Sequence, residues 1–128
     1  MAKFIEKEVL LIKIIRVYDA PAEKKEFRVL VDKLWPRGIS KSTLQPDLWL
    51  KELAPSDDLR KWYHSNPDRW DDFKKKYFSE LNMKINLVED LLQELQLKEE
   101  VMFLYSSKND TTNNAIALKE YVLKITEG

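Results

Sequence analysis

Three short apolar runs, separated by stretches with helical periodicity, constrain the fold of this chain more than any other feature. The runs cover residues 9–18, 27–34 and 100–106, and each places apolar residues on consecutive positions. Strands of this kind are covered on both faces, and strands separated by helices pair in parallel through right-handed crossovers. The sequence therefore predicts an α/β fold with a small, mainly parallel sheet of about three strands and helices packed on it.

The middle of the chain is expected to be rich in helix. An apolar stripe runs through 44–53, and Ser56 is a suitable N-cap for the following segment, which has two acids in its first turn. Asn66-Pro67-Asp68 has the order of cap, proline and acid that begins a helix. Apolar residues then repeat at helical spacing over 70–95, and because so long a helix is unusual in a small domain, we predict a break near 82–86.

The composition excludes several classes of site. The chain has 128 residues and no cysteine, so we expect one domain over 1–128, without disulfides, thiolate chemistry or cysteine-ligated zinc. Its only histidine, His64, has no second histidine with which to bind a metal. We expect no metal, no cofactor and a reducing, cytoplasmic location.

The charge balance and the N-terminal residues narrow the choice of partners. The 22 basic residues balance the 22 acidic ones, which disfavours a dedicated nucleic-acid binder and leaves only a local basic patch open. The first apolar run follows Glu6 and Glu8 and is interrupted by Lys13. It is typical of a strand rather than of a signal peptide or a membrane span, so no membrane association is expected.

Gly38 is the only glycine inside the chain, since the other one is the terminal Gly128. In Pro36-Arg37-Gly38 a residue with fixed φ precedes the arginine, and a residue able to adopt positive φ follows it. Such a loop can hold Arg37 at the end of a strand. The alternative is a plain turn in which the arginine is solvated or structural.

Asp32 should approach the carboxyl edge of the sheet, where open α/β sheets bind ligands. There it could act as a general base, orient a substrate hydroxyl or pair with Arg37. Alternatively, it accepts hydrogen bonds from loop N–H groups or pairs with Arg28. The sequence leaves these alternatives open.

The loop after the third predicted strand would open at the same edge. Lys108 and the N–H groups of the helical turn that contains Asn113 suit an anion such as phosphate or carboxylate. The simpler interpretation is helix capping by Asp110 or Thr111. No Walker or dinucleotide glycine pattern accompanies this loop.

Several cations lie beside tryptophans. An arginine next to a tryptophan, such as Arg60 near Trp62, can clamp an anion or stack on a base, although tryptophans in small domains mostly belong to the core. We interpret Trp70 as a core residue and leave Trp35 open. The candidate site thus comprises Asp32 as a catalytic group and six ligand-binding residues: Arg28, Trp35, Arg37, Arg60, Lys108 and Asn113.

Four segments resemble the YeaO-like family of small bacterial proteins, a domain of unknown function. They are IIRVYDAP (14–21), RVLVDKLWPRG (28–38), LWLKELAPSDDLRKWY (48–63) and NPDRWDDFKKKYFSEL (66–81). The resemblance extends to about residue 123 and implies a compact α/β fold. It implies no established activity.

The chain departs from the family pattern at polar positions. It has Lys25-Glu26 where the family usually has Asp-Gly, and Ser65 where histidine is frequent. It also has Asn109 and Thr112 where the family often has Asp and His. If any of these groups titrates in a family reaction, this protein is altered or inactive in that reaction, so its standing as an enzyme is left open.

The function favoured by the sequence is a site for an anionic or phosphorylated small molecule, with Arg37 and Lys108 positioning the ligand against Asp32. Whether the site also catalyses a reaction is not decided by any motif. The alternatives are nucleic-acid binding through Arg, Lys and Trp side chains, or a protein-interaction module in which Arg37 is purely structural. No feature of the sequence indicates the oligomeric state.

Overall fold

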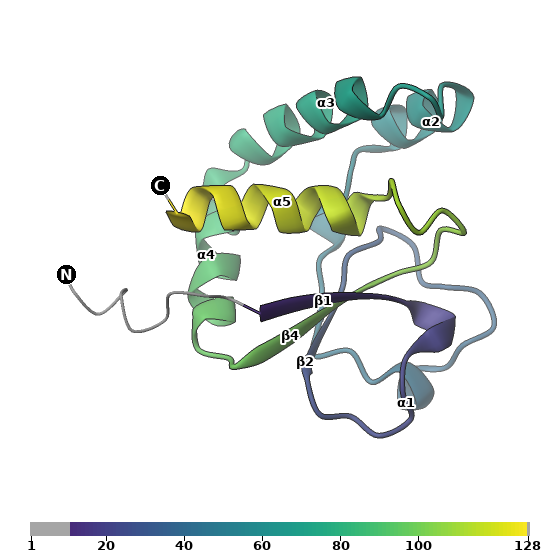
Figure 1. Cartoon of the computed structure of the whole chain (residues 1–128), viewed down its shortest axis with the longest axis vertical. Helices are drawn as coiled ribbons and strands as arrows, with labels where there is room; N and C mark the ends of the chain where they lie inside the picture. Colours follow the sequence, from purple (N-terminus) through teal and green to yellow (C-terminus); the bar gives the residue numbers. More distant parts are fainter. Residues whose placement is uncertain (1–10, 128) are drawn as a thin grey trace.

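The computed structural model describes residues 11–127 and contains a parallel sheet of four strands (Figure 1). The strands are β1 (Leu11–Arg16), β2 (Phe27–Leu30), β3 (Leu48–Trp49) and β4 (Glu100–Tyr105). Their order in the sheet is β1-β4-β2-β3, and every pair is parallel. The α/β class and the parallel sheet are confirmed. Residues 9–10, which were predicted to begin the first strand, lie outside the described residues.

The predicted number of about three strands is too low because β3 forms within a segment predicted from its apolar stripe to be helical. A short helix, α1 (Lys41–Leu44), ends at Gln45, whose φ of 53° is left-handed. Pro46 cannot continue that helix. The Asp47 backbone nitrogen instead donates to the Arg28 carbonyl at 2.8 Å, which aligns the next residues with β2.

The second strand is shorter than the predicted 27–34. After Leu30 the chain makes one more bond to β4, from the Val31 nitrogen to the Leu104 carbonyl at 3.0 Å. Asp32 then hydrogen-bonds to Ser106 through its side chain. The apolar character of the run therefore extends beyond its pairing in the sheet.

The middle of the chain is helical, as predicted. The longer helices are α2 (Asp57–Ser65), α3 (Trp70–Asn82), α4 (Ile85–Gln96) and α5 (Asn114–Glu127), and two 3-10 turns are η2 (Val17–Asp19) and η3 (Lys51–Leu53). Ser56 is confirmed as the N-cap of α2, because its hydroxyl accepts a hydrogen bond from the Leu59 nitrogen. The predicted break in the long apolar stripe falls at 83–84, between α3 and α4.

The predicted helix start at Asn66 is wrong. The Asn66 nitrogen donates to the Tyr63 carbonyl, so this residue ends α2, and α3 begins at Trp70.

No helix within 11–127 is long and apolar enough to cross a membrane.

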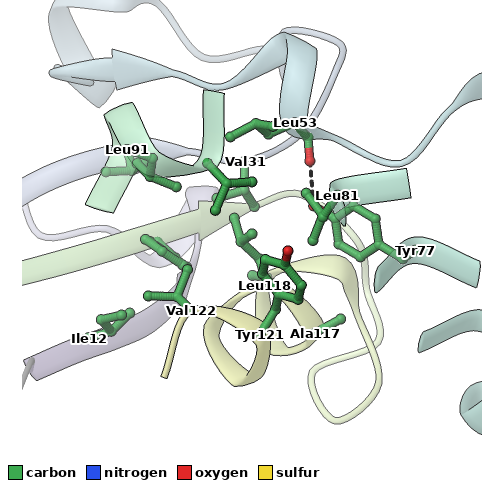
Figure 2. Close-up of a cluster of buried hydrophobic side chains, with 14 of the residues drawn as sticks. Ile12, Val31, Leu53, Tyr77, Leu81, Leu91, Ala117, Leu118, Tyr121 and Val122 are labelled. Carbon is green, nitrogen blue, oxygen red and sulfur yellow. Dashed lines mark hydrogen bonds between the residues drawn. The ribbon is translucent and has the colours of Figure 1, made fainter. Parts of the chain in front are cut away.

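The sheet is covered on both faces. Side chains of β4 alternate, so that Val101, Phe103 and Tyr105 join the larger core and Met102 and Leu104 join the smaller one. Helix α5 lies along the first face, between the sheet and α3 (Figure 1). In the larger core Val31 and Leu118 pack among buried residues of several helices, and the Tyr77 hydroxyl donates to the Leu53 carbonyl (Figure 2).

The smaller core, on the other face, contains a fully buried arginine. Arg28 is 0% exposed, and its guanidinium donates to the carbonyls of Leu44, at 2.7 Å, and Pro21. These bonds hold the β1–β2 connection, at Pro21, and the β2–β3 connection, at Leu44, against β2. Trp35 and Trp49 pack against this core with their rings edge to face.

Candidate functional site

A pocket of about 500 Å³ opens at the carboxyl edge of the sheet. Its lining comes from the segments that follow β1, β2 and β4, from α2 and α3, and from the beginning of α5. The residues that carry polar or aromatic groups into it are Tyr18, Asp32, Lys33, Trp35, Arg37, Arg60, Tyr63, His64, Phe73, Ser106, Ser107, Thr112, Asn113 and Asn114. This is the edge at which the sequence predicts a ligand site.

Asp32 joins the elements that frame the pocket. Its Oδ2 accepts hydrogen bonds from the backbone nitrogen of Ser106 at 2.8 Å and from the Ser106 hydroxyl at 2.6 Å. Its Oδ1 accepts one from the Asn114 side-chain amide at 3.1 Å, and its carbonyl accepts one from the Trp49 indole at 2.7 Å. Both carboxylate oxygens are therefore engaged in holding strand ends and α5 together.

The loop that carries Arg37 is fastened on both sides. The Arg37 carbonyl accepts a hydrogen bond from the Tyr18 hydroxyl at 2.8 Å, and the Trp35 indole donates to the Ile39 carbonyl at 2.7 Å. Gly38 has a φ of 76°, the left-handed conformation that the sequence pattern requires of it. The Arg37 side chain is exposed and makes no ion pair within the described residues 11–127.

Lys33 and Arg60 also line the pocket and share a carboxylate. Arg60 pairs with Asp57 at 2.9 Å, and Lys33 pairs with the same oxygen at 3.1 Å. The hydrogen bond from Arg60 and then that from Lys33 hold the pKa of Asp57 below its ordinary value. Asp57 thus orients two cations at the pocket while neutralising part of their charge.

Asn113 is the N-cap of α5. Its Oδ1 accepts from the Ile116 nitrogen at 3.0 Å, and its amide donates to the Asn109 carbonyl at 2.9 Å. The capping expected of Asp110 or Thr111 is thus performed by a residue nearer the helix. Asn113 is buried and contributes to the pocket lining.

The structure brings five of the seven predicted site residues to one pocket: Asp32, Trp35, Arg37, Arg60 and Asn113. It does not bring the other two there. Arg28 is buried in the smaller core, bound to backbone carbonyls, and Lys108 is exposed on the loop after β4 without lining the pocket.

Sequence reasoning missed several lining residues. Tyr18 is the last residue of the predicted strand 9–18 and Lys33 lies one residue before the end of 27–34, so proximity to a strand end could have identified them. Tyr63 and His64 reach the pocket only because α2 folds over the sheet edge, which no local pattern reveals. Thr112, at a position where the sequence departs from the family pattern, also lines the pocket.

Tyr63 and Phe73 give the pocket an aromatic wall, and Trp70 packs against Phe73. The Tyr63 and Phe73 rings are stacked with centroids 4.4 Å apart, and Trp70 stacks on Phe73 with a centroid separation of 5.6 Å. Phe73 is buried, whereas Tyr63 and Trp70 are half-buried. The core interpretation of Trp70 is confirmed by its packing against the larger core.

The charges around the pocket favour an anion over a cation. Lys33, Arg37 and Arg60 line it, whereas Asp32 is the only acidic residue among the lining residues that the structure describes. Among residues 11–127, no three His, Asp or Glu side chains are grouped so that they could hold a metal ion. The arrangement provides guanidinium donors near an aromatic wall, a combination suited to binding a small anion.

The fold and the pocket define a small α/β protein with a cation-lined cavity at the carboxyl ends of parallel strands. The chain belongs to a family described as the inactive DUF488-N3 subclade, whose model matches residues 11–127. This membership and the relatives below confirm the resemblance to YeaO-like proteins.

Two bacterial relatives illustrate the family. The chain is 38% identical over 107 residues to the uncharacterized protein YeaO of Escherichia coli, which covers 84% of this chain and 92% of that protein. It is 41% identical over 78 residues to the uncharacterized protein Rv3073c of Mycobacterium tuberculosis, covering 61% of this chain and 66% of that protein. No solved structure matches the chain significantly.

Proposed function

We propose that the pocket at the carboxyl edge of the sheet binds a small anionic molecule, bearing phosphate or carboxylate, and holds it without catalysing a reaction. The observation that carries the proposal is the local surplus of positive charge. Lys33, Arg37 and Arg60 line one pocket together with a single carboxylate, in a chain whose net charge is zero. The surplus therefore belongs to the pocket and not to the surface as a whole.

Arg37 is the principal anion-binding residue in this proposal. Arg37 is exposed, lines the pocket and makes no ion pair within 11–127, whereas Lys33 and Arg60 share Asp57. A guanidinium presents a planar fork of N–H donors that matches phosphate and carboxylate oxygens. Because hydrogen bonds at Trp35 and Tyr18 already hold the loop, ordering it costs little free energy when a ligand binds.

Binding without turnover is favoured by the state of the polar groups. Both oxygens of Asp32 already accept hydrogen bonds, and the Ser106 hydroxyl donates to one of them. These bonds and the one from the Ser106 nitrogen occupy three of the roughly four lone-pair positions of the carboxylate, which makes Asp32 a poor general base. The description of the subclade as inactive agrees with a site that binds and does not react.

The test compares two variants that remove one positive charge each. Isothermal titration with inorganic phosphate, ribose 5-phosphate and citrate should detect binding to the wild type. Arg37→Ala should weaken that binding by about 10- to 100-fold, which corresponds to the loss of a charge-assisted hydrogen bond. Lys108→Ala is the matched control, because Lys108 is exposed nearby but does not line the pocket.

The two variants separate a built site from general electrostatics. Equal weakening by Arg37→Ala and Lys108→Ala would mean that only the overall field attracts the anion, and the proposed site would be rejected. Absence of binding by any of the three anions at millimolar concentration would also reject it. Formation of a product from ribose 5-phosphate would contradict the proposal that the site does not catalyse a reaction, and would leave the proposal of anion binding intact.

A further inference from the structure

Two large apolar side chains are exposed at the same pocket that carries the cations. Tyr18 is 45% exposed and Leu34 is 62% exposed, and both line the cavity. Leu34 follows Lys33 directly, and the Tyr18 hydroxyl is bonded to the Arg37 carbonyl. Binding is favoured when a ligand covers exposed apolar groups and removes them from water. The cation-bearing rim is thus also an apolar rim.

Tyr18 is exposed and yet fixed in orientation. Its hydroxyl donates to the Arg37 carbonyl at 2.8 Å, and the Arg16 guanidinium carbon lies 4.8 Å from the centre of its ring. Arg16 is itself held, because its Nε donates to the carbonyls of Ser106 at 3.1 Å and Ser107 at 2.9 Å. A ring held in this way can stack on a ligand without first losing conformational freedom.

The tether also places the aromatic platform next to the anion-binding residue. Because the Tyr18 hydroxyl contacts the backbone of Arg37, the ring and the guanidinium belong to neighbouring parts of one rim. A ligand that uses both needs only a short connection between its apolar part and its charged part. The aromatic wall formed by Tyr63 and Phe73 continues the apolar surface into the cavity.

We infer that the pocket takes an aromatic anion, in which a planar ring is joined directly or through one or two bonds to a phosphate or carboxylate. The ring stacks on Tyr18 and is covered by Leu34, while the anionic group binds Arg37. This inference rests on the proposed anion site and adds the chemical class of the ligand. A sugar phosphate or an aliphatic acid would use only the charged half of the pocket.

The experiment measures dissociation constants for ligand pairs of similar size that differ in aromaticity. Phenyl phosphate is compared with cyclohexyl phosphate, benzoate with cyclohexanecarboxylate, and inorganic phosphate serves as the bare anion. The wild type should bind the aromatic member of a pair about three- to tenfold more tightly, as expected for a stacking contact. The pair that shows this preference identifies whether the anionic group is phosphate or carboxylate.

Three variants assign the preference to the rim. Tyr18→Leu should abolish the preference for the ring, whereas Tyr18→Phe, which retains the ring and loses only its tether, should preserve part of it. Leu34→Ser should weaken both members of a pair by a similar factor and leave inorganic phosphate unchanged. Thermal melts of the three variants show that each remains folded.

The outcomes separate this inference from the proposal on which it rests. Equal affinity for aromatic and cyclohexyl ligands, with a loss of both in Arg37→Ala, would overturn the aromatic class and leave the anion site intact. A preference that survives in Tyr18→Leu would overturn the stacking role of Tyr18. No binding by any of the five probes would overturn the anion site and the inference together.

Discussion

The carboxylate of Asp32 lies 2.8 Å from the backbone nitrogen of Ser106 and 2.6 Å from its hydroxyl oxygen, across 74 positions of sequence. The contact ties the end of β2 to the end of β4, and the Asn114 amide adds the beginning of α5. These three elements carry much of the pocket. A side chain that the sequence presents as a catalytic candidate thus holds the frame of the site.

Replacing Asp32 by Ala should lower the free energy of unfolding by about 1.5–3 kcal/mol, because it removes an ionised acceptor and leaves its donors without a partner. Urea denaturation measures the change. Asp68→Ala is a suitable control, since Asp68 is exposed in the turn before α3 and should change stability by less than about 0.5 kcal/mol. Equal effects of the two substitutions would contradict the framing role of Asp32.

Arg28→Ala should be more damaging, lowering stability by about 3 kcal/mol or more. The substitution empties a fully buried position and leaves the carbonyls of Leu44 and Pro21 without their donors. Guanidinium chloride denaturation is the measurement, with Arg69→Ala as the control. Arg69 forms an exposed ion pair with Asp72, so its loss should cost less than about 1 kcal/mol.

Stability should fall in acid partly because of Glu26. This side chain is 8% exposed, and the hydrogen bond from Lys13 at 2.9 Å lowers its pKa below the ordinary value despite the opposing effect of burial. A lowered folded-state pKa stabilises the protein above the unfolded-state pKa, about 4.3 for Glu, and this stabilisation is lost as the pH falls through the folded-state pKa.

Urea denaturation between pH 7 and pH 3 tests the role of Glu26. The stability difference between wild type and Glu26→Gln should be largest at neutral pH and shrink below about pH 4.3. Glu23→Gln is the control, because Glu23 is exposed and its ion pair with Lys25 is 3.9 Å long. A difference that stays constant with pH would contradict the assignment.

Backbone conformation gives a paired prediction of opposite sign. Gly38→Ala should destabilise the protein by about 1 kcal/mol, because its φ of 76° is unfavourable for a residue with a side chain. No atom lies within 4 Å of the added Cβ, so the cost comes from the backbone conformation and not from a clash. Gln45→Gly should be neutral or stabilising, because Gln45 has a left-handed φ of 53°. Thermal melts of both variants measure these shifts, and a loss of stability in Gln45→Gly would contradict the argument.

The sequence predicts the elements whose pattern is decided locally. Consecutive apolar residues identify the segments of β2 and β4, and Ser56 identifies the start of α2. Two patterns mislead because other contacts outweigh them, a tertiary one at Leu48 and a local one at Asn66. The apolar spacing around Leu48 is typical of a helix, but this segment pairs with β2 and forms a strand. Asn66 is of the residue type that caps the start of a helix, but its side-chain amide donates to the end of α2.

The site follows the same division. Asp32 and Arg37 can be predicted because they follow a strand at the carboxyl edge, whereas the approach of α2 that brings Tyr63 and His64 depends on the packing of the whole molecule. Lys108 does not reach the pocket although it follows β4. In its loop the Asn109 side chain accepts hydrogen bonds from the nitrogens of Thr111 and Thr112, so the polar groups there are satisfied within the loop.

The central place of β4 in the sheet affects how the protein is made. β1 and β2 do not pair with each other, and both pair with β4, the last of the four strands in the sequence. A nascent chain therefore cannot assemble the sheet before residue 105 leaves the ribosome. Contacts so distant in sequence slow folding. Chains that stall before β4 expose unpaired strand edges, which makes them prone to aggregate.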